Sequence, residues 1–230
     1  MTRAMKLVIA NKNYSSWSMR PWTAMRGLGI PFEEQRLSFT LGIQSGFRDA
    51  VRAISPAGRV PVLVDGDLVV WDSLAIVEYL HERFPKAGVW PSDMAARARA
   101  RSICAEMHSG FSALRQHCGM NIEARLPEIG AKVLRTEPAV AKDLARIDTL
   151  WSDALRASHG PFLFGQFSAA DAYYAPVATR IRTYALPMSP TSLAYVDRLL
   201  ASPGPAAWIA DALTEAEFVP EDEPYRTKRS

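Results

Sequence analysis

The feature that most constrains the fold is a short apolar run followed by a polar, tryptophan-containing turn near the start of the chain. The run, residues 6–10, is typical of a buried β-strand, and residues 11–22 read NKNYSSWSMRPW before a helical-looking segment over residues 23–29. Backbone N–H groups at a helix start lack intrahelical partners and suit an anion. Pro21 is tolerated early in this helix because the first turn has no such bonds to lose. We therefore predict that this turn is the active centre.

The first 85 residues alternate strands and helices and end in a hairpin and a helix. Asp65 followed by Gly66, between two apolar runs, favours a tight hairpin turn. The predicted order is strand, helix, strand, helix, strand, strand, helix, and the later elements cover residues 31–39, 44–53, 61–64, 68–71 and 72–84.

The remainder of the chain has helical periodicity after a break rich in proline and glycine. We predict a domain over residues 1–85, a linker over 86–91 and an all-helical domain over 92–230. Apolar stripes predict long helices over residues 100–118 and 140–155.

Local signals mark three further segments of this helical domain. Ser168 and Asp171, three residues apart, predict a capping box at a helix start, which assigns both to structure. Residues 126–138 are less regular and predict a loop. The polar residues 221–230 predict a loose tail.

Composition excludes several classes of function. The 27 basic and 24 acidic residues give a net charge of only +3, which does not favour nucleic-acid binding. Two cysteines, Cys104 and Cys118, form no disulfide framework and favour a reducing compartment. No apolar run is long enough for a signal-peptide core or for the ~20 residues that span a bilayer. We predict a cytoplasmic protein that does not bind nucleic acid or membranes.

Four motifs, in order along the chain, resemble those of the cytosolic glutathione transferases, in particular the serine-type zeta-like and theta-like members. They are the turn Ser15-Ser16-Trp17-Ser18-Met19-Arg20, the tripeptide Arg59-Val60-Pro61, the helix start Trp71-Asp72-Ser73-Leu74-Ala75-Ile76, and the capping box Ser168-Ala169-Ala170-Asp171. The resemblance implies a thioredoxin-like α/β domain followed by an all-α helical bundle that carries the electrophile pocket. It also implies glutathione as co-substrate, a homodimer and a role in detoxification.

The resemblance assigns glutathione-binding roles to six residues. Val60 and Pro61 correspond to the family's cis peptide, whose valine backbone pairs with the cysteinyl part of glutathione. Asp72 and Ser73, at a helix start, correspond to residues that hold the ammonium and the carboxylate of the γ-glutamyl end. The candidates for the glycyl end are Arg59 and Gln44.

Ser15 is the residue that we expect to hold the glutathione sulfur as a thiolate; Ser16 is the alternative, and Tyr14 a further one. The thiolate is the nucleophile, and lowering a thiol pKa of ~8.5 by two units needs about 2.7 kcal/mol. A hydroxyl hydrogen bond to a charged acceptor supplies roughly 1.5–3 kcal/mol, and a helix N-terminus adds roughly 0.3–2 kcal/mol. No metal or general base is required.

The electrophile pocket has no motif of its own. In the family it is built on the first long helix of the helical domain, and the candidates in this chain are Trp17, Met107, His108, Phe111 and Arg115. Core packing is the competing interpretation of the apolar members. Cysteine and histidine near residues 104–118 lack the paired spacing of zinc sites, so we expect no metal.

Two other functions stay open from the sequence. Zeta-like members isomerise maleylacetoacetate, but this chain has Trp17 where they usually carry cysteine. The fold also serves as a non-catalytic binding module, as in the stringent-starvation proteins that dock on RNA polymerase. Such modules tend to lose the activating residue, which is retained here as Ser15.

Overall fold

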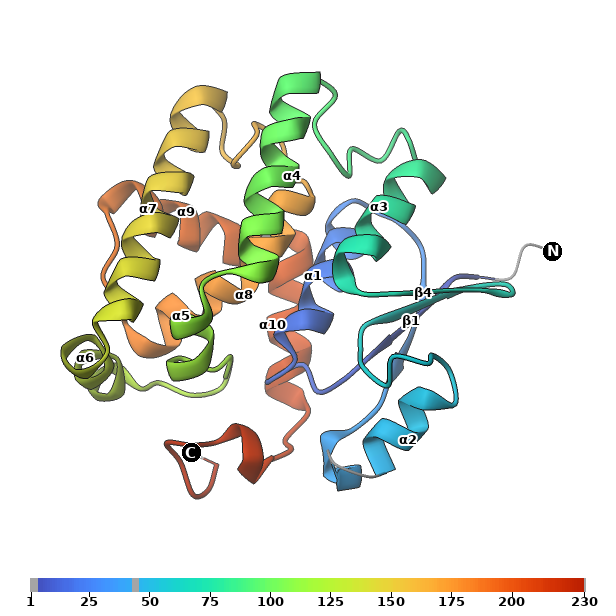
Figure 1. Ribbon diagram of the computed structural model, residues 1–230, viewed down its shortest axis with the longest axis horizontal. Helices are drawn as coiled ribbons and strands as arrows, with labels where there is room; N and C mark the ends of the chain where they lie inside the picture. Colours follow the sequence, from blue (N-terminus) through green and yellow to red (C-terminus); the bar gives the residue numbers. More distant parts are fainter. Residues whose placement is uncertain (1–3, 43–45, 230) are drawn as a thin grey trace.

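The computed structural model describes residues 4–42 and 46–229; Gln44, a candidate for the glycyl end, lies outside them. The amino-terminal part is a four-stranded mixed sheet with helices on both faces (Figure 1). The strand order is β2-β1-β3-β4; β2 is parallel to β1, β3 is antiparallel to β1, and β4 is antiparallel to β3. The elements are β1 (Lys6–Ile9), α1 (Ser16–Gly27), β2 (Glu33–Arg36), η1 (Phe39–Leu41), α2 (Phe47–Arg52), β3 (Val62–Asp65), β4 (Leu68–Trp71) and α3 (Ser73–Arg83).

Alternate residues of the central strands face opposite sides of the sheet, so the sheet contributes to two cores. Leu7 and Ile9 face the larger core, which continues into α1, α3 and the helical domain. Val8 faces the smaller core under α2, whose other buried members are Ala10, Phe47, Val51 and Val62. Because both faces of the sheet are covered, the chain here is apolar at every position from Leu7 to Ala10.

The hairpin predicted from Asp65 and Gly66 is confirmed. Asp65 pairs with Leu68 across the turn, and Gly66 adopts a φ of 61°. A positive φ is accessible to glycine without steric penalty, which is why the turn forms here.

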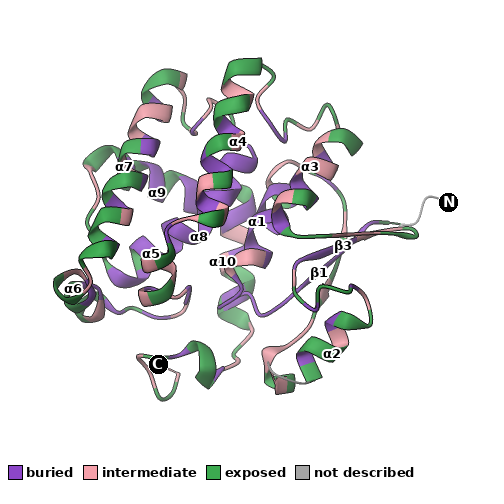
Figure 2. Cartoon of the chain, in the orientation of Figure 1, coloured by how far each residue is buried: buried purple, intermediate pink, exposed green. Residues whose placement is uncertain are grey.

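The elements described in the carboxy-terminal part are helices, apart from isolated β-bridges that pair Phe162 with Gly165 and Phe164 with Gln166, and its centre is α8 (Figure 1). All residues of α8 except Arg182 are buried (Figure 2). The capping box of Ser168 and Asp171 at its start is confirmed. No helix in the described ranges is long and apolar enough to cross a membrane. The helices are α4 (Met94–Ser109), α5 (Ser112–His117), α6 (Pro127–Thr136), α7 (Pro138–Ser158), α8 (Ala169–Tyr184), α9 (Pro190–Ala201), α10 (Pro203–Thr214) and η3 (Pro220–Asp222).

Helix α1 joins the two halves of the molecule because it packs against both α8 and α10. The backbones of α1 and α10 approach closely at Gly204. A Cβ atom at Gly204 would lie 2.3 Å from the carbonyl oxygen of Thr23, so this contact excludes any larger side chain. The turn before α1 is therefore held against the helical domain.

Three predicted elements differ from the structure. Helix α1 begins at Ser16 and not near residue 23, which places Pro21 in its second turn. The stripe over residues 100–118 belongs to two helices, because the backbone turns at Phe111, whose φ is 53°. The loop predicted over residues 126–138 is mostly helix α6, which begins with a proline at its first position.

The polar tail predicted over residues 221–230 is bound to the rest of the chain where it is described. The Tyr14 hydroxyl donates a hydrogen bond to Glu223 at 2.7 Å, and Arg229 pairs with Glu123 at 3.1 Å. The prediction of a loose tail was wrong because its charged side chains have partners that only the folded chain brings near.

Candidate active site

The turn between β1 and α1 presents Ser15 at the helix start. The N–H groups of Tyr14 and Ser15 both donate to the carbonyl oxygen of Asn11, at 3.2 and 2.8 Å, which closes the turn. Ser15 occupies the N-cap position, but in the described structure its side chain makes no capping hydrogen bond. Helix capping therefore does not explain this serine.

The Ser15 hydroxyl is instead hydrogen-bonded to a second serine of the motif. Its Oγ lies 2.8 Å from Oγ of Ser18, which is completely buried and accepts a hydrogen bond from the N–H of Ala10 at 3.3 Å. Ser18 thereby connects the end of β1 to the Ser15 side chain. In this arrangement Ser15 donates to Ser18, so its hydroxyl proton must rotate away from Ser18 to be donated to an anion in the cleft.

Ser15 lines a cavity of about 290 Å³ that adjoins a second cavity of about 300 Å³. The two share Trp17, Arg59 and Val60 as wall residues. Cavities of this size suit small ligands, and an extended peptide can occupy both. The remaining residues of the Ser15 cavity are Tyr14, Ser16, Phe39, Phe47, Arg48, Gly58 and Asp222, and those of the second cavity are Ala57, Pro61, Trp71, Asp72, Ser73 and His108.

The second cavity contains the start of α3 and the peptide before β3. The bond between Val60 and Pro61 is cis, as the resemblance implied. Asp72 caps α3 by accepting the N–H of Leu74 at 2.7 Å, and its other carboxylate oxygen lies 3.4 Å from Nε2 of His108. These contacts leave the cleft with a carboxylate and a helix N-terminus side by side.

Ser73 is linked to the helical domain. Its hydroxyl is nearly inaccessible to solvent and accepts a hydrogen bond from the Tyr173 hydroxyl of α8 at 3.0 Å. Burial raises the pKa of Tyr173 well above its usual range, so Tyr173 stays a neutral donor. The Ser73 proton is then free to be donated toward the cavity.

Tyr14 lines the same cavity as Ser15, but its hydroxyl already donates a hydrogen bond to Glu223. Burial and the hydrogen bond to the Glu223 carboxylate raise the pKa of Tyr14 to about 12. A phenol directed at a carboxylate is a poor partner for a second anion, which disfavours Tyr14 as the thiol donor. Ser16 also lines the cavity and is partly exposed.

Most of the predicted site residues lie together in the two cavities, and three of the described ones do not. Met107 and Phe111 lie in the hydrophobic core and line neither cavity. Arg115 lines neither cavity, but its guanidinium lies 5.4 Å from the Trp17 ring centre. The members in the cavities are Ser15, Trp17, Arg59, Val60, Pro61, Asp72, Ser73 and His108.

Several residues of the cleft were not predicted. Arg48 and Asp222 line the Ser15 cavity, and Tyr173 supports Ser73. In the sequence, Arg48 was marked only by its positive charge and its position near the start of a short helix. Asp222 and Tyr173 carry no local signal because they reach the cleft from distant parts of the chain.

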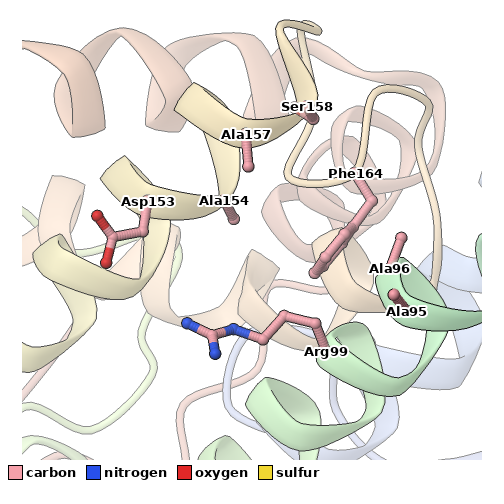
Figure 3. A pocket seen from close by; sticks show the side chains of 8 residues that line it. All are labelled: Ala95, Ala96, Arg99, Asp153, Ala154, Ala157, Ser158 and Phe164. Carbon is pink, nitrogen blue, oxygen red and sulfur yellow. The ribbon is translucent and has the colours of Figure 1, made fainter.

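A larger cavity of about 520 Å³ lies away from this turn, between α4 and α7 (Figure 3). Its walls are mainly alanine, with Arg99 and Asp153 at the same opening (Figure 3). Its serine, Ser158, is hydrogen-bonded to backbone carbonyl groups of Leu155 and Phe162. This cavity therefore offers packing surface and no available nucleophile or thiol partner.

The sheet topology, the cis peptide and the position of the cleft define a protein class: a thioredoxin-like domain joined to a helical domain. Family models of the glutathione S-transferase N-terminal and C-terminal domains match residues 14–83 and 94–211. The second match alone spans more than half of the chain. The chain belongs to the glutathione S-transferase family.

Relatives with assigned names support this placement to different extents. A dichloromethane dehalogenase from Methylorubrum extorquens is 41% identical over 29% of this chain and 23% of its own. A zeta-class glutathione S-transferase from Euphorbia esula is 28% identical over 74% of both chains. A solved glutathione transferase homologue from Sulfitobacter, with bound glutathione, is 25% identical, with a TM-score of 0.68 over 90% of this chain and 97% of its own. The chain spans between 40% and 45% of the length of four other curated relatives that it matches.

Proposed function

We propose that the protein binds glutathione in the two adjoining cavities, ionises its thiol beside Ser15 and transfers the sulfur to a small electrophile. The observation that carries the proposal is the Ser15 hydroxyl, which lies at the N-terminus of α1, lines the cavity and is not used as a helix cap. Asp72 and Ser73 hold the γ-glutamyl end, Val60 pairs with the cysteinyl backbone, and Arg59 lies near the glycyl end.

The chemistry uses groups of this chain together with solvent water. The thiol loses its proton to solvent as the Ser15 hydroxyl donates to the sulfur, and the N–H groups at the start of α1 add to the stabilisation of the negative charge. The sulfur then forms a bond to the electrophilic carbon, and the leaving group departs with its bonding electron pair. Without a leaving group, the carbon next to the new bond takes a proton from water.

Calorimetric titration with glutathione, in two buffers of different ionisation enthalpy at pH 7, tests this proposal. We expect binding with release of up to one proton, because a thiol of pKa ~8.5 is mostly protonated in solution and ionises in the site. S-methylglutathione, which has no thiol proton, should bind with no such release. The proton release should be reduced in Ser15→Ala. The matched control variant is Ser102→Ala, because Ser102 is exposed on α4 and donates to the carbonyl oxygen of Ala98.

The outcomes separate the candidate functions. Binding of both ligands with equal proton uptake or release means that the site holds glutathione without ionising it. No binding of either ligand contradicts the transferase proposal and favours the non-catalytic module. An isomerase would share the proton release, so it is distinguished by its substrate.

We also propose that the protein is a homodimer, with the second copy seated against β4 and the start of α4. Leu68 and Trp71 of β4 and Met94 of α4 are large apolar side chains that are 47%, 46% and 76% exposed. Met94 directly precedes Ala95, which lines the cavity of Figure 3, and that cavity offers room for an inserted side chain. Sedimentation at micromolar concentration should give a dimer that Met94→Glu shifts toward monomer. A monomer at every concentration contradicts this prediction.

A further inference from the structure

Three arginines from three helices lie close together behind the cleft. Arg20 of α1 and Arg180 of α8 are buried, with 1% and 4% of their surface exposed, and Arg115 of α5 is partly exposed. They are near enough to repel one another: burial and the Arg115 charge lower the pKa of Arg20 to about 10, and burial and the Arg20 charge lower the pKa of Arg180 to about 10. Both remain charged at neutral pH.

None of the three makes an ion pair with a carboxylate within the described ranges. Arg180 donates to the backbone carbonyls of Cys118 and Pro176. Nε and Nη1 of Arg20 and Nε of Arg115 are buried without any hydrogen-bond partner. Buried charges are costly to leave unpaired, so an anion that enters this region gains a strong interaction.

The contacts of Arg20 place this charge directly behind Trp17. The Arg20 guanidinium lies 4.1 Å from the centre of the Trp17 ring and 4.8 Å from that of Tyr173. Trp17 is a wall of both cavities, and His108, whose Nδ1 is also buried without a partner, stands edge-on to it at 5.1 Å. Arg115 approaches the same ring and is the member of the cluster with accessible surface.

The cluster is separate from the places assigned to glutathione. Neither Arg20 nor Arg115 lines the two cavities, and the elements around Arg20 include α8 of the helical domain. The carboxylates of glutathione therefore do not account for these charges.

We infer that the electrophile carries a carboxylate, which pairs with Arg115 at the edge of Trp17 and is further attracted by Arg20. This inference rests on the proposed transferase function. A guanidinium presents parallel N–H donors that match the two oxygens of a carboxylate, which is why arginine and not lysine suits this role.

The test compares two electrophiles that differ in one charge, 4-chloro-3,5-dinitrobenzoate and 4-chloro-3,5-dinitrobenzamide. In both, the glutathione sulfur bonds to the ring carbon as the carbon–chlorine bond breaks and chloride leaves. The ratio of kcat/KM for the acid to that for the amide is divided by the ratio of the uncatalysed rates. We expect the corrected ratio to be at least about 10, which corresponds to about 1.4 kcal/mol, and Arg115→Gln to reduce it about 10-fold.

Arg135→Gln is the matched control, because Arg135 is exposed on α6 and its loss changes net charge equally. Arg135→Gln should leave the corrected ratio unchanged, and Arg115→Lys should retain more of the ratio than Arg115→Gln does. An equal fall for both electrophiles in Arg115→Gln would overturn the inference, since the charge would then act on the thiolate or on folding. A corrected wild-type ratio near 1 would overturn it as well.

Calorimetry with the unreactive 3,5-dinitrobenzoate and 3,5-dinitrobenzamide, in the presence of glutathione, keeps the two proposals distinguishable. Selective binding of the acid without turnover of either electrophile would support the anion site and contradict transferase activity. Turnover of the amide without selective binding of the acid would support the transferase and overturn the anion site.

Discussion

Replacing Ser15 by alanine is expected to lower kcat/KM for glutathione at pH 7 by about 10- to 150-fold, the loss of roughly 1.5–3 kcal/mol of hydrogen bonding to a charged acceptor. The Ser15 hydroxyl lies at the start of α1, makes no capping hydrogen bond and is bonded to Ser18 and not to a carboxylate. Without it, the thiol pKa returns toward ~8.5, and a smaller fraction of bound glutathione is thiolate at neutral pH.

The pH dependence distinguishes this role from a structural one. Because the variant raises the thiol pKa, its deficit should be largest below pH 7 and should nearly disappear above pH 9, where the thiol ionises unaided. Ser16→Ala, in the same cavity, should change the rate much less. A deficit of the same size at every pH would contradict thiolate stabilisation, and a larger effect of Ser16→Ala would transfer the role to Ser16.

The second large effect is expected at Lys12, where replacement by methionine should lower the free energy of unfolding by about 1.5–3 kcal/mol, the range for hydrogen bonds to charged groups. The Lys12 side chain is 4% exposed, and its Nζ lies 2.7 Å from Oε2 of Glu34 and 2.5 Å from Oδ2 of Asp211. The ammonium also lies 4.5 Å from the ring centre of Trp22. Removing it leaves two facing carboxylates without their shared cation at the junction of α10 with the sheet domain.

Urea unfolding followed by circular dichroism measures this change, and the melting temperature should fall by roughly 3–12 °C. Lys142→Met is the matched control, because Lys142 is exposed on α7, and its effect should stay within about 0.5 kcal/mol. The effect of Lys12→Met should persist in 1 M salt, because buried charges are screened little. A change as small as that of the control would show that the Lys12 contacts do not stabilise the junction.

The local sequence was sufficient to predict an element wherever a few neighbouring residues decide its structure. The hairpin at Asp65 and Gly66, and the capping box of Ser168 and Asp171, each need only backbone preferences and hydrogen bonds within four residues. The prediction of a loop over residues 126–138 was wrong, because contacts with distant helices decide the structure of that segment. The helix α6 in that segment is amphipathic and packs against α7 and α8, and the stabilisation from such packing has no local signature.

For the candidate site, the sequence by itself predicted the turn with Ser15, the Val60–Pro61 peptide and the Asp72–Ser73 helix start, because each is a short motif with a local conformation. Only the tertiary structure decided how these motifs are completed. The Ser73 hydroxyl meets Tyr173, one hundred residues later, and Tyr14 meets Glu223. Arg20 of α1 and Arg115 of α5 meet at the Trp17 ring, and the charge of Arg20 also acts on Arg180 of α8. A short motif determines the local conformation of its own few residues. The burial of a side chain, its hydrogen-bond partners and its repulsion by other charges depend on which distant helices the hydrophobic core packs against it.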